Sequence, residues 1–307
     1  MSFDGVFLHK LLPEFEILKT GRISKIIESG DTDFILTIRV NHQNINLMIS
    51  LSSEFSRIHI TNKIYTAPLN PKSLTMFLRK HIEGYFIEDI QQFENDRIVY
   101  FKLAGYNEMK DYTHKYLICE IMGRYSNLIL TDESFKILEV LKHDGVSEFS
   151  RTMLPNAIYE FPKTNKINPF KALDFTHISS PKDLCNQFCG VSMLLSIYAF
   201  KNDQILDNFK DALNFKTKPS IFKNNLGKVD FYYHPLNFEC IQEYTSLSEL
   251  LDEYYYEEDN KAKIKNKTND LANFVAKQIK KNEKKIEKLE SDLISAQNAD
   301  EDKIKGE

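Results

Sequence analysis

Alternating apolar and polar positions in the first half of the chain predict a series of β-strands. Phe34, Leu36, Ile38 and Val40 occupy every second position, and the same period resumes after an Asn-His-Gln-Asn turn. The predicted strands are 22–28, 33–40, 45–51, 57–61, 86–93, 97–104, 115–122, 126–131 and 136–142. They predict an α+β domain with a mainly antiparallel sheet, like other folds that mix hairpins with few helices.

Two helices interrupt these strands. Residues 6–19 have apolar positions at helical spacing, with Pro13 as a break or kink. Residues 72–83 follow Asn70-Pro71, which predicts a helix N-cap with proline in the first turn, and Gly84 predicts the helix end.

The second half of the sequence changes character. Residues 155–169 contain three prolines and predict an extended linker, after which the chain is expected to be helical. A capping motif at Ser180 to Asp183 begins one helix, and Gly190 separates it from the next. Two short helices around a glycine form either a helix-hairpin-helix that grips a phosphate backbone or two ordinary core helices, and the pattern favours neither.

A second capping motif, Ser246 to Glu249, begins a Lys/Glu-rich segment. Apolar residues from Ala272 to Ala296 recur every three or four positions, with Asn282 on the same seam, which predicts one arm of a coiled coil. We interpret its basic face as solvated. Because a seam needs a partner helix, we expect the natural chain to continue. The predicted domains are 1–168, 169–256 and 257–307.

Composition narrows the function. The 307 residues are 42% hydrophobic and carry a net charge of −4, so any nucleic-acid contact should be local. No apolar run is long enough to span a membrane, and the N-terminus lacks the basic region of a secretory signal. Four scattered cysteines fit a reducing compartment, so we expect a cytoplasmic protein. Without a catalytic or metal-binding motif, we expect no enzyme, metal or cofactor.

The polar clusters on the sheet are the candidate binding residues. Asp96-Arg97 begins one predicted strand, and the run from Glu120 to Asn127 follows another. Arginine suits phosphate because its planar fork donates two hydrogen bonds, and Asp96 could orient it or accept from a base or ribose. The plainer alternative is a surface ion pair. Other supporting groups in the first domain are Arg22, Lys25, Arg57, Arg79, Lys80, Arg124, Ser126 and Asn127.

These motifs carry a family resemblance. The opening Met-Ser-Phe-Asp-Gly, the Asp-Arg-Ile-Val at 96–99 and the Glu-Ile-Met-Gly-Arg-Tyr-Ser-Asn at 120–127 resemble the NFACT family. Further matches at 21–26, 55–61, 77–84, 154–162 and 246–255 extend the resemblance to essentially the whole chain. It implies an N-terminal domain like that of the Fpg/Nei glycosylases, a helix-hairpin-helix domain, a coiled-coil hairpin and a C-terminal RNA-binding domain that this chain lacks.

The resemblance also implies a role in ribosome quality control. Family members bind a large ribosomal subunit obstructed by peptidyl-tRNA, recruit charged tRNA and direct template-free tailing, with tRNA(Ala) and alanine in bacteria. The residues that carry over as tRNA-binding are Asp96, Arg97, Asp4, Glu120, Ile121 and Arg124. The alternative implied by an older family name is a surface adhesin that binds fibronectin or fibrinogen, with a minor pool at the cell surface.

Overall fold

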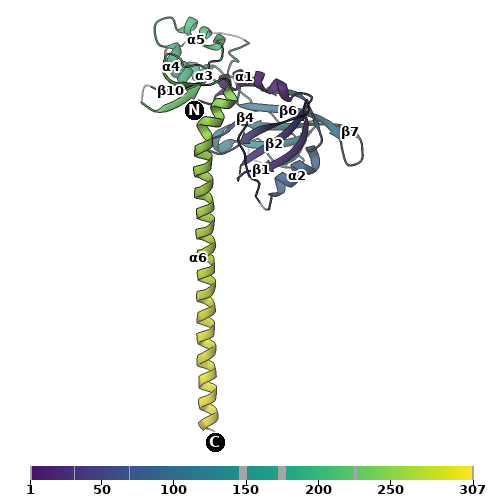
Figure 1. Ribbon diagram of the computed structural model, residues 1–307, viewed down its shortest axis with the longest axis vertical. Helices are drawn as coiled ribbons and strands as arrows, with labels where there is room; N and C mark the ends of the chain where they lie inside the picture. The colour runs from purple at the N-terminus through teal and green to yellow at the C-terminus, as the bar shows by residue number, and fades with distance from the viewer. Residues whose placement is uncertain are drawn as a thin grey trace. The chain divides into compact units, whose positions relative to one another are not determined.

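A nine-stranded sheet, antiparallel throughout, forms the centre of the first part of the chain (Figure 1). Its spatial order is β4-β3-β2-β1-β5-β6-β7-β8-β9. The strands are β1 Arg22–Glu28, β2 Asp33–Val40, β3 Gln43–Ser50, β4 Arg57–Thr61, β5 Phe86–Gln92, β6 Ile98–Tyr106, β7 Tyr112–Glu120, β8 Asn127–Asp132 and β9 Ile137–Val140. All nine predicted strands are present within one to three residues at each end, so the α+β prediction is confirmed.

The structure, a computed structural model, describes residues 2–30, 32–68, 70–144, 151–171, 178–224 and 227–305. The chain divides into two compact units, Met1–Tyr256 and Glu257–Glu307. The sequence boundary proposed between residues 168 and 169 falls within the first unit. The boundary between the first two predicted domains, 1–168 and 169–256, therefore stays a prediction.

Both faces of the sheet are buried where the candidate clusters lie. Val99, Phe101 and Leu103 of β6 join the main hydrophobic core, whereas Ile98 belongs to a second cluster with Ile118 on the opposite face. This alternation is the pleat that the sequence predicts. The cluster on the second face fixes the strands that carry the polar residues.

The first predicted helix has two parts. α1 (Gly5–Leu11) is α-helical, and η1 (Leu12–Leu18) is a 3-10 helix that contains Pro13. Proline has no N–H to donate and crowds the preceding turn, which accounts for the change. The apolar face nevertheless stays continuous, because Phe7, Leu11 and Phe15 are all buried.

The second predicted helix begins later than expected. α2 (Ser73–Ile82) has Lys72 at its N-cap, without a side-chain capping bond, so the assignment of Asn70 as cap is wrong. Glu28 of β1 supplies the missing acceptor, because its carboxylate accepts from the Lys72 N–H at 3.1 Å and from the Thr75 hydroxyl. A long-range carboxylate therefore replaces the local cap.

The segment read as a linker is bound to the sheet. The Ile137 N–H donates to Ala157 and the Tyr159 N–H donates to Phe135, at 2.8 and 2.7 Å. Tyr159 is 3% exposed and lies in the second-face cluster. The chain here is extended, as predicted, but it covers the sheet instead of separating domains.

The region after residue 178 is only partly helical. It contains α3 (Pro181–Gln187), α4 (Met193–Ala199) and α5 (Ile205–Asn214), and the capping box of Ser180 with Asp183 is present. A small sheet follows, formed by β10 (Ser220–Lys223), β11 (Val229–Tyr232) and β12 (Glu239–Glu243). The expectation of an all-helical region is wrong there, because strands of four or five residues are too short for a pattern of period two to identify.

One long helix, α6 (Leu247–Lys305), ends the described chain. Its first N–H groups are capped by Ser246 and by Glu14 of η1, whose carboxylate accepts from Leu247 at 2.6 Å and from Ser248 at 3.0 Å. Further along, the seam residues Val275, Ile279, Ile286, Leu289 and Leu293 are 47–59% exposed. The side chain of Ala296 lies outside the described residues.

A buried polar network joins the start of α6 to β4. The Asp252 carboxylate accepts from Thr61 at 2.6 Å and from the Asn62 N–H at 2.9 Å, and it lies 2.9 Å from His59 Nε2. Burial opposes ionisation of Asp252, but the hydrogen bonds from His59, Thr61 and Asn62 outweigh it and lower the pKa of the carboxyl. A carboxyl with a lowered folded-state pKa stabilises the fold above its ordinary pKa and loses that effect as pH falls.

Replacing Asp252 with Asn should therefore destabilise the chain in a pH-dependent way. We expect a loss of about 1–3 kcal/mol at pH 6, because donors facing residue 252 lose an acceptor. The loss should shrink towards pH 3, below the ordinary aspartate pKa of about 3.9. Denaturant unfolding at both pH values measures it, with Glu253→Gln as the control, since the Glu253–Lys63 ion pair is partly exposed. An equal loss at both pH values would contradict the explanation.

Candidate nucleic-acid interface

The Asp96-Arg97 pair lies in a tight turn between β5 and β6. The Asp96 N–H donates to the Phe93 carbonyl at 2.7 Å, and the Phe93 N–H donates to the Ile98 carbonyl at 3.0 Å. The two residues between Phe93 and Asp96, Glu94 and Asn95, have φ of 47° and 69°. Two successive left-handed residues are typical of the type I′ turns that suit the twist of antiparallel strands. We call residues 93–97 the Asp-Arg turn.

Two glycines allow other parts of the chain to touch this turn. A β-carbon on Gly5 would lie 1.8 Å from the Asn95 carbonyl oxygen, and one on Gly190 would lie 1.9 Å from the same oxygen. The Val6 N–H donates to the Gly190 carbonyl at 3.1 Å, and the Asn95 side-chain amide donates to Cys189 at 2.8 Å. The start of α1, the Asp-Arg turn and the α3–α4 turn are therefore in backbone contact.

The Asp4 carboxylate stabilises the same junction by accepting hydrogen bonds from three residues. One carboxylate oxygen accepts from the Phe7 N–H at 2.7 Å as the N-cap of α1, and the other accepts from the Ser192 N–H at 3.2 Å and the Tyr232 hydroxyl at 2.7 Å. Asp4 is 5% exposed, and burial raises the pKa of its carboxyl. It is thus placed to position the turn and not to meet a ligand directly.

The α3–α4 turn is the one that a helix-hairpin-helix would use to hold phosphate. Here the Ser192 N–H, at the start of α4, donates to the Asp4 carboxylate. Gly190, with φ of 69°, faces the Asn95 carbonyl. The Asp4 carboxylate therefore occupies the place where a helix-hairpin-helix would bind an external phosphate. In this structure the α3–α4 turn instead packs against the start of α1 and the Asp-Arg turn.

The second predicted cluster meets the Asp-Arg turn at the same edge of the sheet. Glu120, the last residue of β7, pairs with Ile98, the first residue of β6, and the Ile121 N–H donates to the Arg97 carbonyl at 2.8 Å. The structure therefore brings together Asp96, Arg97, Glu120 and Ile121. The pairing of β6 with β7 therefore holds both clusters at one end of these two strands, on a rigid sheet.

Glu120 and Ile121 are nevertheless buried, at 2% and 0% exposure. The Glu120 carboxylate accepts hydrogen bonds from both terminal nitrogens of Arg151, at 2.7 and 3.0 Å, and from the Tyr159 hydroxyl, at 2.8 Å. Burial opposes the charge of Arg151, but hydrogen bonding to Glu120 outweighs it and raises the pKa of the guanidinium. This bidentate pair fastens residues 151–159 over the second face of the sheet.

The solvent-accessible groups at this edge are few. Asp96 and Arg97 are half-buried, and Asp96 Oδ1 accepts from the Arg97 N–H at 2.7 Å, so the aspartate fixes the backbone from which Arg97 extends. Glu94 pairs with Lys171 at 2.6 Å. Arg124, in the short 3-10 helix η2 (Gly123–Tyr125), is exposed, with its guanidinium 4.6 Å from the centre of the Tyr125 ring.

Other predicted basic residues lie elsewhere. Arg22 donates to the Gly84 carbonyl at 3.2 Å and pairs with Phe86, at the end of β5 away from the Asp-Arg turn. Arg79 donates to Ile26 at 2.7 Å from α2, and Lys80, on the same helix, pairs with Glu108 at 3.4 Å. A single basic face that combines these residues with the Asp-Arg turn is not what the structure shows.

Three of the predicted supporting residues are internal. Arg57 is 0% exposed, donates to Phe55 and lies 4.5 Å from the centre of the Tyr255 ring. The Ser126 hydroxyl accepts from the Met122 N–H, and the Asn127 amide donates to Lys142. Ser126 and Asn127 stabilise the segments on either side of β8, whereas Arg57 packs against Tyr255 of α6, so all three would act on a ligand only indirectly.

Arg151 and Lys171 were missed by the sequence reasoning. Both lie outside any recognisable motif, and only the fold brings them to Glu120 and Glu94.

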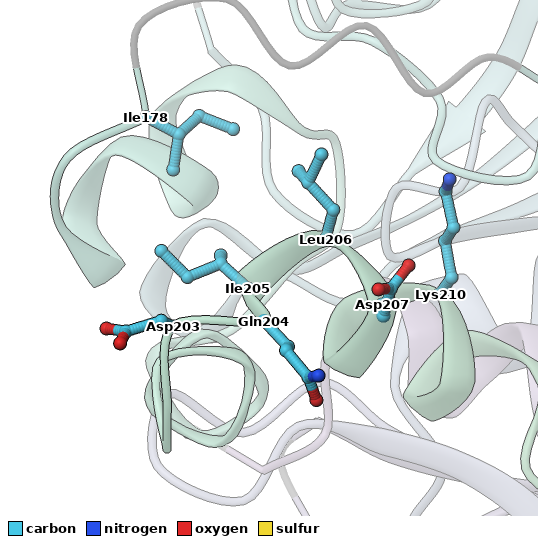
Figure 2. Close-up of a pocket in the computed structure, with 7 residues that line it drawn as sticks. All are labelled: Ile178, Asp203, Gln204, Ile205, Leu206, Asp207 and Lys210. Atoms are coloured by element: carbon cyan, nitrogen blue, oxygen red, sulfur yellow. The ribbon is translucent and has the colours of Figure 1, made fainter.

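A separate pocket of about 490 Å³ lies at the start of α5, and Figure 2 shows Asp203, Asp207 and Lys210 among its lining side chains. Its two carboxylates disfavour a phosphate backbone.

Within the described residues, no group of His, Cys, Asp and Glu side chains is arranged to hold a metal ion. All four cysteines are free thiols, and Cys119 is buried in the core. Among the described helices, none has the length and apolar character needed to cross a membrane.

Comparison with known families decides the relationship. Residues 4–307 match the family described as NFACT N-terminal and middle domains. The chain belongs to the NFACT family. The resemblance read from its motifs is therefore confirmed.

The NFACT relatives include proteins named Rqc2 homolog RqcH. Those from Streptococcus suis and Bacillus subtilis are each 37% identical to this chain over its whole length. The chain spans 57% and 58% of the length of these two relatives.

Solved structures of NFACT relatives share the fold. The N-terminal part of a fibronectin/fibrinogen-binding protein from Streptococcus suis has a TM-score of 0.74 and 37% identity, and it covers 83% of this chain and 100% of its own. A fibrinogen-binding protein from Staphylococcus aureus has a TM-score of 0.73 and 33% identity, with 83% and 99% covered. Both agree with the mixed α+β architecture.

The glycine contacts yield a test of how the Asp-Arg turn is held. Gly190 and Gly227 have nearly equal φ, 69° and 72°, but a β-carbon on Gly227 would meet nothing within 4 Å. Gly227→Ala should therefore cost only the left-handed strain of about 1–2 kcal/mol. Gly190→Ala should add a clash with the Asn95 carbonyl and cost roughly 2–5 kcal/mol.

Denaturant unfolding of the two variants measures this difference directly. Equal losses of stability would show that the close approach of Gly190 to Asn95 is unimportant.

Proposed function

We propose that this chain is the ribosome- and tRNA-binding part of a ribosome quality control factor. It would bind a large ribosomal subunit obstructed by peptidyl-tRNA and recruit tRNA(Ala), so that stalled nascent chains receive an alanine tail without a template. The ribosome would form the peptide bonds, and the protein would position the tRNA without enzymatic chemistry or a cofactor of its own. The proposal places it in the cytoplasm, associated with ribosomes.

The observation that carries the proposal is a rigidly held turn that ends in a polar pair, Asp96-Arg97. Asp96 and Arg97 are accessible, while the residues beneath them, Asp4, Asn95 and Glu120, are buried and hydrogen-bonded. An arginine on a fixed backbone loses little freedom on binding, and its fork matches phosphate or a base edge. The kinship with proteins named Rqc2 homolog RqcH supports tRNA as the ligand.

The net charge of −4 fits a small contact surface. A surface that makes few phosphate contacts has a shallow salt dependence, unlike a protein that coats RNA. Specificity for one tRNA would then come from shape and from a few base contacts. The exposed seam of α6 supports a further part of the proposal, that this helix is one arm of a coiled coil.

The alternative function is adhesion through fibronectin or fibrinogen, the ligands after which the two similar solved structures are named. It would imply a pool of the protein at the cell surface. The accessible charged pair at the sheet edge does not discriminate between these ligands and RNA, so binding experiments must.

Combined replacement of Asp96 and Arg97 by Ala should weaken tRNA binding roughly 10-fold or more, as the loss of a specific arginine contact does. Arg22→Ala combined with Lys80→Ala, which removes charge at the other end of β5, is the matched control and should change binding less than about 3-fold. Filter binding or fluorescence anisotropy with tRNA(Ala) measures both. Equal affinities for all three proteins would refute the assignment of the turn, and binding of fibronectin with no tRNA affinity would favour adhesion.

Asp96→Asn separates two roles of the aspartate. The Asn side chain keeps an oxygen for the Arg97 N–H but loses the negative charge. If Asp96 only fixes the backbone, tRNA affinity should stay within about 3-fold of the original, whereas Asp96→Ala should lose roughly 10-fold. An equal loss for both variants would mean that the charge itself contacts RNA.

A further inference from the structure

Aromatic side chains form a continuous strip that leads away from the Asp-Arg turn. The Phe93 ring, at the start of the turn, stacks on Phe161 with centroids 4.3 Å apart, and Phe161 meets Tyr100 at 5.5 Å. Tyr100 meets Tyr116 at 6.3 Å, and Tyr116 stacks on Phe135 at 4.6 Å with only 6° between the ring planes. All five rings are half-buried. These rings are therefore more exposed than the side chains on the opposite face of the sheet, such as Val99 and Phe101, which are fully buried.

The strip ends in a small pocket of about 170 Å³. Its lining residues are Asp89, Gln91, Tyr100, Lys102, Tyr116 and Phe135. Their positions follow from the strand register, which sets Asp89 against Lys102 and Lys102 against Tyr116 across β5, β6 and β7. The volume suits one flat heterocycle and not a folded peptide segment.

Polar atoms border the rings. The Tyr100 hydroxyl donates to the Gln91 side-chain oxygen, and the Gln91 amide donates to the Asp89 carboxylate. Asp89 also pairs with Lys19 at 3.1 Å, and Lys102 pairs with Glu88 at 2.9 Å. Lys19 also pairs with Glu16 at 2.8 Å, so the lysines neutralise these carboxylates only in part, and the pocket offers acceptors for an amino group.

The residue that forms one wall of the pocket has an unfavourable backbone. Phe135 has φ of 62°, a left-handed conformation that is an outlier for a bulky side chain. The Asp132 carboxylate maintains it, because this group accepts from the Ser134 N–H and the Lys136 N–H, both at 2.9 Å. The Phe135 N–H also donates to the Asp132 carbonyl at 3.2 Å, so the left-handed residue closes the turn between β8 and β9 and holds its ring against Tyr116.

We propose that this pocket binds one unpaired RNA base, stacked on the Tyr116–Phe135 ring pair, further along β5 and β6 from the Asp-Arg turn. The proposal rests on the proposed function and specifies the ligand as single-stranded RNA. Unpaired bases are held in proteins by aromatic stacking and by hydrogen bonds to their edges, whereas paired bases are inaccessible to such a pocket. Arg97 would hold the backbone, and the pocket would hold a base further along the same RNA strand.

A tryptophan at position 116 tests this proposal, because the chain has no Trp of its own. We expect the fluorescence of Tyr116→Trp to be quenched in a saturable way by tRNA and by a single-stranded RNA oligonucleotide. A blunt RNA duplex with the same number of phosphates should not quench it. Tyr112→Trp, on the same strand but 57% exposed and outside the pocket, is the matched control and should not respond.

Removal of the ring gives a second measurement. Tyr116→Leu should weaken tRNA binding roughly 10-fold, the loss expected for one stacked base. It should leave the salt dependence unchanged, because no phosphate contact is lost. Should position 116 prove intolerant of Trp, Phe135→Trp places the same reporter on the ring that stacks on Tyr116.

The outcomes separate this proposal from the proposed function. If the chain binds tRNA through Asp96 and Arg97 but the fluorescence of both reporters is unchanged, the base pocket is refuted and the quality control role stands. Quenching by duplex RNA equal to that by single strands would also refute it. If the oligonucleotide quenches the reporters while replacement of Asp96 and Arg97 has no effect on tRNA binding, the pocket stands and the Asp-Arg assignment falls.

Discussion

The contact among Gly5, Asn95 and Gly190 is the constraint on which the interface depends. Three segments that are far apart in the sequence meet there with their backbones in contact, and only residues without a β-carbon fit at two of the three positions. The Asp4 carboxylate completes the junction through the first N–H groups of α1 and α4. The Asp-Arg turn is therefore part of a rigid unit, although its own residues lie in a loop.

This arrangement divides the family motifs into two roles. Asp4, Glu120 and Ile121 are buried and hold the geometry, whereas Asp96 and Arg97 are accessible. The position of the Asp-Arg turn is fixed by neutral contacts and by internal ion pairs such as that of Glu120 with Arg151. Polar residues in a motif need not all touch the ligand.

Local patterns predict the large sheet well: the apolar residues at every second position of β2 are buried, and β8 is buried over nearly its whole length. The antiparallel pairing of β6 with β7 then brings the Asp-Arg turn beside Glu120, since the start of one strand lies beside the end of the next. Local patterns fail where distant residues decide: Glu28 caps α2 in place of Asn70, and Arg151 turns an expected linker into a cover for the sheet. The burial of Arg57 and the separation of Arg22 from the turn likewise depend on tertiary contacts that no local pattern contains.

The central claim is that a tRNA contacts the Asp-Arg turn and the residues beside it. Amide hydrogen exchange of the chain with and without tRNA(Ala) tests it most directly, because it reports protection along the whole backbone. The account predicts slower exchange on tRNA addition in residues 93–98 and 121–125, with no change around Arg22 and Gly84 at the far end of β5. Protection confined to that far end, with unchanged exchange in the Asp-Arg turn, would contradict it.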